Sequence, residues 1–325
     1  MDRDNRVIGI DIGGTFCRGM RGAVVDGGAA LGERKEFVTP RTSQEQLVES
    51  LVNMASRLAE GARRDGAPVT AVGVAVPGLI DEGSGVVHRS PNLKLEEVAL
   101  GQILQDRLKL PVFLVHDASA GAVAEYAVGA GRTVSDLLLV VMGVGVGSAV
   151  ISGGRVLRGA HGTAGEIGHI CVDPAGMVCG CGGRGCVETF ASETAIARRY
   201  AMAAKQAILA EEVIAKATAG DPAAARIWGD ALGALATVIA TAVALVDCEL
   251  VVLAGTMGIP SVALAPLADL LAQRINLVQL PRVTVGALGA DAALLGAATV
   301  AFERSGMGQP VAEWRSSRRS AADST

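Results

Sequence analysis

The first part of the chain alternates a strand pattern with a helical pattern. The apolar run at residues 7–11 predicts a buried strand, and residues 17–25 and 34–39 extend it as a meander through glycine turns. Leucine, methionine and alanine then recur every three or four positions over residues 44–64, which predicts an amphipathic helix. We therefore expect the chain to open with a small strand meander that is followed by a helix.

The next elements keep the order strand, helix, strand. Short apolar runs at residues 72–76 and 112–115 predict two strands, and residues 95–108 between them predict a helix. Parallel strands have to be joined by a crossover connection, which is most often a helix. The order of these elements therefore predicts a parallel sheet with helices across its faces.

The second half of the chain repeats this order. Residues 137–142 predict a strand, residues 146–151 and 155–156 predict hairpin strands, and helical segments flank a strand at residues 250–253. In each half, a buried strand enters a glycine turn and leaves it as a second strand. We interpret the repeat as a duplicated α/β fold with one phosphate-binding hairpin in each of two lobes.

Composition supports two lobes and argues against nucleic acid as a partner. Half of the 325 residues are hydrophobic, and single cores stop growing near about 250–300 residues. Only 3% are aromatic and 42 are glycine, so small aliphatic side chains build the core. The formal charge of -4 comes from 33 acidic and 29 basic residues, without a long basic run that could bind a nucleic acid.

We predict the cellular location of the protein from the ends of the chain and from its most apolar stretch. The N-terminal residues lack the apolar segment and cleavage site of a secreted protein, so we expect a cytoplasmic one. Residues 232–246 include Gly233, Thr237 and Thr241 and are too few to span a bilayer of about 30 Å. We expect a buried helix there and no membrane partner. Residues 305–325 are rich in serine and arginine, which predicts a disordered tail.

Two adjacent glycines follow the first strand. No lysine follows a glycine anywhere in the sequence, so the P-loop pattern is excluded. In the turn from Asp11 to Thr15, the backbone N–H groups of Gly13 and Gly14 could approach a phosphate closely, and the threonine hydroxyl could add a donor. Asp11 could orient a hydrated Mg²⁺. Taken alone, the motif favours a plain hairpin with an Asx turn.

One histidine and three cysteines have the spacing of a metal site. His169, Cys179, Cys181 and Cys186 offer four soft or borderline ligands, which suits tetrahedral Zn²⁺. Four protein ligands favour a structural site over one that activates water. A redox dithiol or unrelated thiols are the alternatives, and the spacing favours zinc. The other cysteines, at positions 17, 171 and 248, are expected to be core thiols.

A carboxylate follows the predicted strand at residues 112–115. Asp117 opens the next helical run, and the carboxyl ends of parallel strands face the crevice where open α/β sheets bind ligands. The position also suits a helix N-cap, which is the favoured interpretation of this residue alone.

Several motifs occur in a fixed order along the chain. They are Asp11-Ile12-Gly13-Gly14-Thr15, Pro77-Gly78, Ser90-Pro91-Asn92-Leu93, His116-Asp117-Ala118, the run from Gly162 to His169, and the run from Cys179 to Thr189. Together they resemble the ROK family of repressors and sugar kinases from about residue 7 to residue 300. The resemblance implies the duplicated, two-lobe α/β fold of the actin-like (ribonuclease H-like) ATPases. Residues 1–116 and 290–304 would form a small N-terminal lobe, and residues 117–289 a large lobe with the zinc loop.

The resemblance also implies roles for individual residues. The aspartate that matches Asp117 is the catalytic base in this family, and the histidine that matches His169 binds both zinc and sugar. The other positions implied in sugar binding are Gly78, Asn92, His116, Glu166 and Glu188. Those implied in nucleotide binding are Asp11, Gly13, Gly14, Thr15, Gly143, Val144, Gly145 and Gly255. The implied cofactors are ATP, catalytic Mg²⁺ and structural Zn²⁺.

The function implied is transfer of the terminal phosphate of MgATP to a hexose hydroxyl. Glucose is the favoured acceptor, with N-acetylmannosamine, N-acetylglucosamine and allose as alternatives. A sugar-sensing regulator and a pseudokinase that binds sugar without phosphotransfer are alternatives of another class. The family's repressors carry an N-terminal winged helix-turn-helix, for which the residues before Val7 leave no room. We expect sugar and ATP as partners and a homodimer or homotetramer.

Three positions depart from the family pattern. His116 stands where the family has asparagine, Val144 where it has threonine, and residues 254–256 replace a run of glycines. Loss of one hydroxyl donor costs about 0.5–1.5 kcal/mol, so the reaction is expected to slow without stopping. We expect Asp117, Glu166, Glu188 and the Gly13-Gly14 turn to converge on one cleft between the lobes.

Overall fold

The computed structural model describes residues 6–25, 28–257 and 259–306. The chain divides into two compact units. The first unit comprises Met1–Arg132, Gly153–Ala164 and Asp291–Thr325, and the second comprises Thr133–Ser152 and Gly165–Ala290. Apart from Ser305 and Gly306, the predicted tail at residues 305–325 lies outside the described residues.

The sheet of the first unit confirms the predicted meander and parallel strands. The strands are β1 (Arg6–Ile12), β2 (Phe16–Val25), β3 (Gly28–Val38), β4 (Val69–Val76) and β8 (Val112–His116), and their order is β3-β2-β1-β4-β8. Strands β1, β4 and β8 are parallel, while β2 and β3 are antiparallel to their neighbours. The parallel strands end at the same edge, which is where the motifs around Asp11, Gly78 and Asp117 begin.

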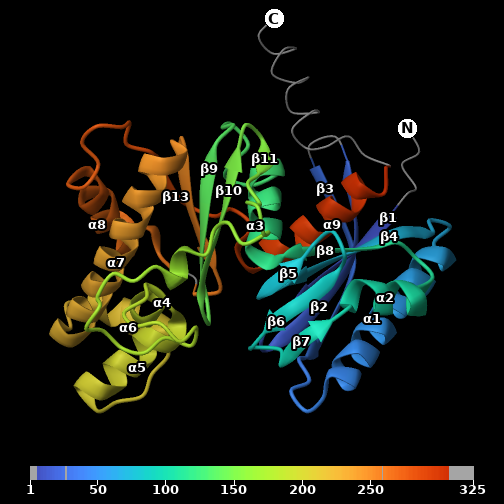
Figure 1. Ribbon diagram of the computed structural model, residues 1–325, viewed down its shortest axis with the longest axis horizontal. Coiled ribbons are helices and arrows are strands. Elements are labelled where there is room, and N and C mark those ends of the chain that lie inside the picture. The colour runs from blue at the N-terminus through green and yellow to red at the C-terminus, as the bar shows by residue number, and fades with distance from the viewer. Residues whose placement is uncertain (1–5, 26–27, 258, 307–325) are drawn as a thin grey trace, which may run out of the picture. The chain divides into compact units, whose positions relative to one another are not determined.

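Helices cover both faces of this sheet (Figure 1). Helix α1 (Gln44–Arg64) packs its leucines against the isoleucine side chains of β1, and α2 (Leu100–Leu108) extends the same core. On the other face, α3 (Asp117–Ala127) and α9 (Ala292–Arg304) pack together over β4 and β8. Glycine lets α9 approach the strands, because a Cβ on Gly73 would lie 1.9 Å from the carbonyl oxygen of Ala297.

Two boundaries differ from the expectations. The helix expected over residues 95–108 begins at Leu100, because Leu95–Val98 form strand β7 and pair with β6 (Val86–Ser90) and, through it, β5 (Leu79–Asp81) in a separate small sheet. Helix α3 belongs to the first unit, whereas the expected large lobe began at residue 117. The close contact of α3 with α9 explains the second difference, since a Cβ on Gly296 would lie 1.8 Å from the carbonyl oxygen of Ala120.

The second unit repeats the strand arrangement of the first. Its strands are β9 (Leu137–Met142), β10 (Val146–Ser152), β12 (Leu250–Gly255) and β13 (Arg282–Val285), in the order β10-β9-β12-β13. The pair β9–β10 is an antiparallel hairpin and β12 is parallel to β9, as β1–β2 and β4 are arranged in the first unit. The predicted duplication of the fold is therefore confirmed.

Helices α4 (Glu188–Ala191), α5 (Glu193–Ala204), α6 (Ala210–Thr218), α7 (Pro222–Val246) and α8 (Ser261–Ala272) complete the second unit. Helix α7 has 25 residues and begins before the apolar stretch at residues 232–246, and by length and composition alone the whole helix is long enough to cross a membrane. Its expected burial is confirmed, because its apolar side chains pack into the core of the second unit. Trp228 also donates a hydrogen bond to the carbonyl oxygen of Ala263 on α8, at 2.9 Å.

Candidate active site and metal centre

The first glycine hairpin is held by side chains that bind its carbonyl groups. Gly13 N donates to the carbonyl oxygen of Phe16 at 3.0 Å, and a Cβ on Gly13 would lie 2.7 Å from that oxygen, so the turn requires glycine. The Thr39 hydroxyl donates to the Gly13 carbonyl at 2.6 Å, and Arg41 donates to the Gly14 carbonyl at 2.8 Å. This turn is therefore fixed more firmly than a plain surface hairpin.

Asp11 lies buried beneath this turn. Its side chain forms an ion pair of 2.8 Å with Arg18, which stands directly opposite it on β2. Burial raises the pKa of Asp11 to about 6, Arg18 opposes the rise, and the carboxylates of Asp117 and Asp291 add to it. Asp11 thus interacts electrostatically with three other charged side chains of the first unit. Oxygen donors of this kind fit a hydrated Mg²⁺, which uses one or two carboxylates.

The structure places the other predicted residues of the first unit on neighbouring segments. A Cβ on Gly14 would lie 3.9 Å from the side chain of Asn92, so the predicted phosphate and sugar residues adjoin each other here. Gly78 precedes β5 with a φ of +107°, and its Cβ would lie 2.4 Å from the carbonyl oxygen of Arg89. Glycine is therefore required at this turn.

Asp117 is the first residue of helix α3, and His116 occupies the N-cap position. The alternative in which Asp117 is the N-cap is therefore wrong. Its side chain is 38% exposed, one carboxylate oxygen accepts the backbone N–H of Ala118 at 2.7 Å, and His116 Nε2 lies 3.4 Å from the same oxygen. A carboxylate that is exposed to this degree can accept a proton from a ligand.

The second glycine hairpin is held in a similar way to the first. Gly143 N donates to the Gly145 carbonyl at 2.9 Å, while Glu193 N and the Thr194 hydroxyl donate to the carbonyls of Gly143 and Val144 at 2.8 and 3.3 Å. Val144 is 52% exposed at the tip of this hairpin. A valine there offers no hydroxyl to a phosphate.

Strand β12 brings Gly255, which is predicted to bind the nucleotide, beside this hairpin. Gly255 has a φ of +130°, and a Cβ on it would lie 1.9 Å from the carbonyl oxygen of Met142. The next residue, Thr256, donates its hydroxyl to the carboxylate of Glu193, and it lies close to Gly143. Sequence reasoning missed Glu193, because the contact joins residues 63 positions apart.

The four predicted metal ligands lie together in the second unit. The ligand atoms of His169, Cys179, Cys181 and Cys186 are all within 4.8 Å of one another. The sulfur atoms of Cys181 and Cys186 are 3.7 Å apart, as are Cys179 Sγ and His169 Nδ1. Tetrahedral ligands with Zn–S bonds of about 2.3 Å are separated by about 3.8 Å, so this donor set fits zinc. A disulfide bond of about 2.05 Å does not fit these separations.

The remaining cysteines do not all match the expectation of core thiols. Cys17 and Cys248 are buried, and burial raises the pKa of each thiol to about 11. Cys171 is exposed, so the expectation is wrong at this position. It lies in the loop of the metal cluster, where its backbone pairs with that of Cys186.

Two predicted sugar-binding carboxylates adjoin the metal cluster. The Nδ1 atom of His169 faces Cys179. Its Nε2 atom faces Glu166 and lies 3.9 Å from a carboxylate oxygen of that residue. One carboxylate oxygen of Glu188 accepts a hydrogen bond from the Cys179 thiol at 3.6 Å, and the other accepts one from the backbone N–H of Val146 at 3.2 Å. Glu188 therefore joins the cysteine loop to the second glycine hairpin. The expected convergence of this group with Asp117 on one cleft stays a prediction.

Comparison with known proteins identifies the family. The ROK family model matches residues 7–304. The chain is 38% identical over 305 residues to N-acetylmannosamine kinase of Citrobacter koseri, a match that covers 90% of this chain and 98% of the relative. It is also 36% identical over 172 residues to the DNA-binding transcriptional dual regulator NagC of Escherichia coli, which covers 53% of this chain and 42% of that protein.

Solved structures show the same fold. The ROK hexokinase of Thermus thermophilus has a TM-score of 0.81 and 32% identity, covering 93% of this chain and all (100%) of that one. A ROK glucokinase of Streptomyces griseus, solved with glucose and AMPPNP, has a TM-score of 0.77 and 27% identity, covering 92% of this chain and 100% of that one. The fold is that of the actin-like ATPases, as predicted, and the chain belongs to the ROK family.

Proposed function

We propose that this protein is an ATP-dependent sugar kinase that phosphorylates N-acetylmannosamine. The observation that carries the proposal is the match to the Citrobacter koseri kinase, which extends over nearly the whole of both chains. The cysteine cluster and both glycine hairpins, which we assign to zinc and to phosphate, also support the proposal. The sequence predicts glucose as the preferred acceptor, and this match favours N-acetylmannosamine instead.

Glucose is the second candidate acceptor. It is supported by the similarity to the glucokinase of Streptomyces griseus, although that identity is lower, at 27%. The two acceptors differ at one ring carbon in configuration and in an acetamido group, so side chains near that carbon decide between them. His116, which departs from the family pattern, is our candidate for this selection.

In the proposed reaction, Asp117 accepts the proton of the attacking sugar hydroxyl. Phosphoryl transfer passes through a loose transition state, so alignment and charge stabilisation supply most of the acceleration. We assign the two glycine hairpins to the phosphates of ATP, and Asn92, Glu166, His169 and Glu188 to the sugar hydroxyls. When bound, Mg²⁺ would offset phosphate charge, with Asp11 as the residue that holds it through water.

Zinc has a structural role in this proposal. His169, Cys179, Cys181 and Cys186 would hold it, and Glu166 and Glu188 are the sugar-binding residues that adjoin these ligands. The metal would thereby hold a glycine-rich loop that has few side chains to pack. The expected homodimer or homotetramer stays a prediction, which light scattering in solution can check.

The test is phosphorylation of a sugar panel with MgATP. We expect turnover with N-acetylmannosamine to exceed that with glucose, N-acetylglucosamine and allose. Asp117→Asn removes the proton acceptor, so we expect kcat to fall by about 10²–10⁴-fold while the melting temperature stays near that of the wild type.

Each other outcome has a clear meaning. Glucose as the best substrate would replace the first candidate with the second. Sugar binding without any phosphorylated product would identify a pseudokinase or a sugar sensor. Equal turnover by wild type and Asp117→Asn would remove Asp117 from its role.

A further inference from the structure

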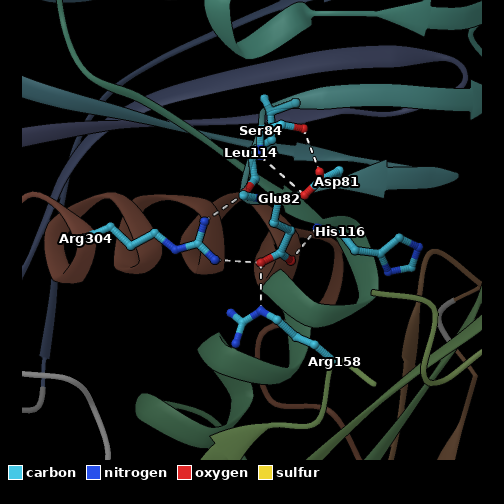
Figure 2. A network of polar contacts seen from close by, with 8 residues as sticks. Asp81, Glu82, Ser84, Leu114, His116, Arg158 and Arg304 are labelled. Carbon is cyan, nitrogen blue, oxygen red and sulfur yellow. Dashed lines mark hydrogen bonds and ion pairs between the residues drawn. The ribbon is translucent and has the colours of Figure 1, made fainter. Parts of the chain in front are cut away.

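A partly buried glutamate joins three distant segments of the first unit. Glu82 follows strand β5, and only 12% of its side chain is exposed. One carboxylate oxygen accepts the backbone N–H of His116 at 3.2 Å. The other accepts Arg158 Nε at 2.8 Å and Arg304 Nη2 at 2.6 Å, as Figure 2 shows. These partners are 34, 76 and 222 residues away in the sequence.

The turn that carries Glu82 is fixed independently of these contacts. The carboxylate of Asp81 accepts the backbone N–H groups of Gly83 and Ser84, at 2.8 and 3.3 Å, and the Ser84 hydroxyl at 2.7 Å (Figure 2). Asp81 therefore shapes the turn, and Glu82 is left to point toward the end of β8. The two adjacent acids therefore have different roles, because Asp81 stabilises the turn and Glu82 contacts the end of β8.

The charges around Glu82 keep its carboxylate ionised. Burial alone would raise its pKa, but the hydrogen bonds and positive charges of Arg158 and Arg304 hold the pKa of Glu82 below its ordinary value. Arg304 also donates to the carbonyl oxygen of Leu114 on β8, at 3.4 Å. The last residue of helix α9 and the turn after β5 thus bind the same strand end.

The segments that Glu82 joins are the ones that carry the proposed reaction in this unit. Strands β5 and β6 lie between Gly78 and Asn92, and the hydrogen bond to His116 is made at the residue before Asp117. His116 Nε2 lies 3.4 Å from the Asp117 carboxylate. A shift of the His116 backbone would therefore move both the N-cap residue of α3 and the carboxylate that follows it.

We infer that Glu82 is a positioning residue for Asp117, which it acts on through the backbone of His116 while Arg158 and Arg304 hold Glu82 in place. The inference rests on the proposed sugar kinase activity. A misplacement of about 1 Å at a reacting group costs about 10²-fold in rate, so a partial shift is expected to give a smaller but measurable loss. ATP binding is not expected to change, because Glu82 contacts neither glycine hairpin in the described residues.

The test compares four forms of the full chain. Glu82→Gln keeps the shape of the side chain and removes its charge. Glu49→Gln breaks another Glu–Arg ion pair of the same unit, the 2.7 Å contact between Glu49 and Arg107 on the surface. Val52→Ala removes buried methyl groups from α1 and so lowers stability without touching β8. Together with the wild type, they are assayed with MgATP and the best sugar, well below the lowest melting temperature.

We expect Glu82→Gln to lower kcat by about tenfold and to leave the KM for ATP within about twofold of the wild type. Glu49→Gln and Val52→Ala should keep the wild-type kcat. If Glu82→Gln and Val52→Ala show the same kcat, Glu82 has a structural role only and the inference is overturned, while the proposed function stands. If the wild type turns over no sugar, the proposed function fails and the role of Glu82 fails with it.

Discussion

At the residue scale, Asp11 shows how a site can use a buried charge. Its carboxylate has an arginine partner, yet burial still raises its pKa, because the loss of water exceeds the gain from one ion pair. Two further carboxylates, Asp117 and Asp291, act in the same direction. A group of acids that repel one another is suited to receive a cation.

The raised pKa of Asp11 predicts a pH dependence of stability. The pKa rises from 3.8 to about 6 on folding, so the folded protein binds this proton more tightly than the unfolded chain. Raising the pH from about 4 to about 7 should therefore lower the free energy of unfolding of the wild type relative to Asp11→Asn, by about 3 kcal/mol at most. Urea unfolding of both proteins across this range measures the difference, without added Mg²⁺. Parallel pH curves for the two proteins would contradict the prediction.

At the element scale, short loops contain most of the residues that we assign to the proposed reaction, and both glycine hairpins are held by a neighbouring element. Thr39 and Arg41, which follow β3, hold the first hairpin, and the start of α5 holds the second. The cysteine loop differs, because four of the eight residues from Cys179 to Cys186 are glycines, which have no side chains to pack. A metal ion would replace the missing packing.

Loss of a cysteine ligand should therefore unfold this loop. We expect the wild type to contain about one zinc ion per chain, and we expect Cys181→Ser to contain less zinc and to melt at a lower temperature. Elemental analysis and thermal unfolding measure the two effects. Cys171→Ser is the matched control, because Cys171 is an exposed cysteine of the same loop outside the four ligands, and it should keep both zinc and stability. Carefully purified wild type without zinc would contradict the metal assignment.

Local patterns predicted the elements and motifs well, and long-range contacts explain what they missed. The glycine hairpins and the cysteine spacing are contiguous in sequence, so the spacing by itself favours zinc, and the glycines indicate phosphate once they are combined with the other motifs of the ROK pattern. Asp291 and Glu82 carry no such pattern. Asp291 interacts with Asp11 only because α9 returns to β1, and Arg304 reaches Glu82 for the same reason. The length of α7 was missed because its first turns include Arg226 and Asp230, which interrupt the apolar run.

At the scale of the whole molecule, the two units are interleaved along the chain. The chain passes from one unit to the other after residues 132, 152, 164 and 290. Helix α9 therefore completes the first unit from the far end of the sequence, and it covers the glycine-lined face of β1 and β4. No single continuous stretch of the sequence therefore contains the whole first unit.

Removal of α9 should prevent the first unit from folding. A chain that stops after Ala290 exposes the apolar face of β4 and β8 and loses the contact of Gly296 with α3, so we expect aggregation or loss of cooperative unfolding. A chain that stops after Gly306 keeps α9 and removes only residues 307–325, and it should match the full chain. Circular dichroism during heating compares the three forms. A cooperative transition of wild-type size in the shorter chain would contradict this prediction.

The late position of α9 also has a consequence for biosynthesis. During translation, the strands of the first unit leave the ribosome long before the helix that covers them, and the whole second unit is made in between. Until then, the face of β1 and β4 that contains Gly9 and Gly73 is uncovered on the nascent protein, and exposed apolar surface of this kind is prone to aggregation. A chain whose synthesis halts within the second unit would lack α9, so its first unit could not complete its fold.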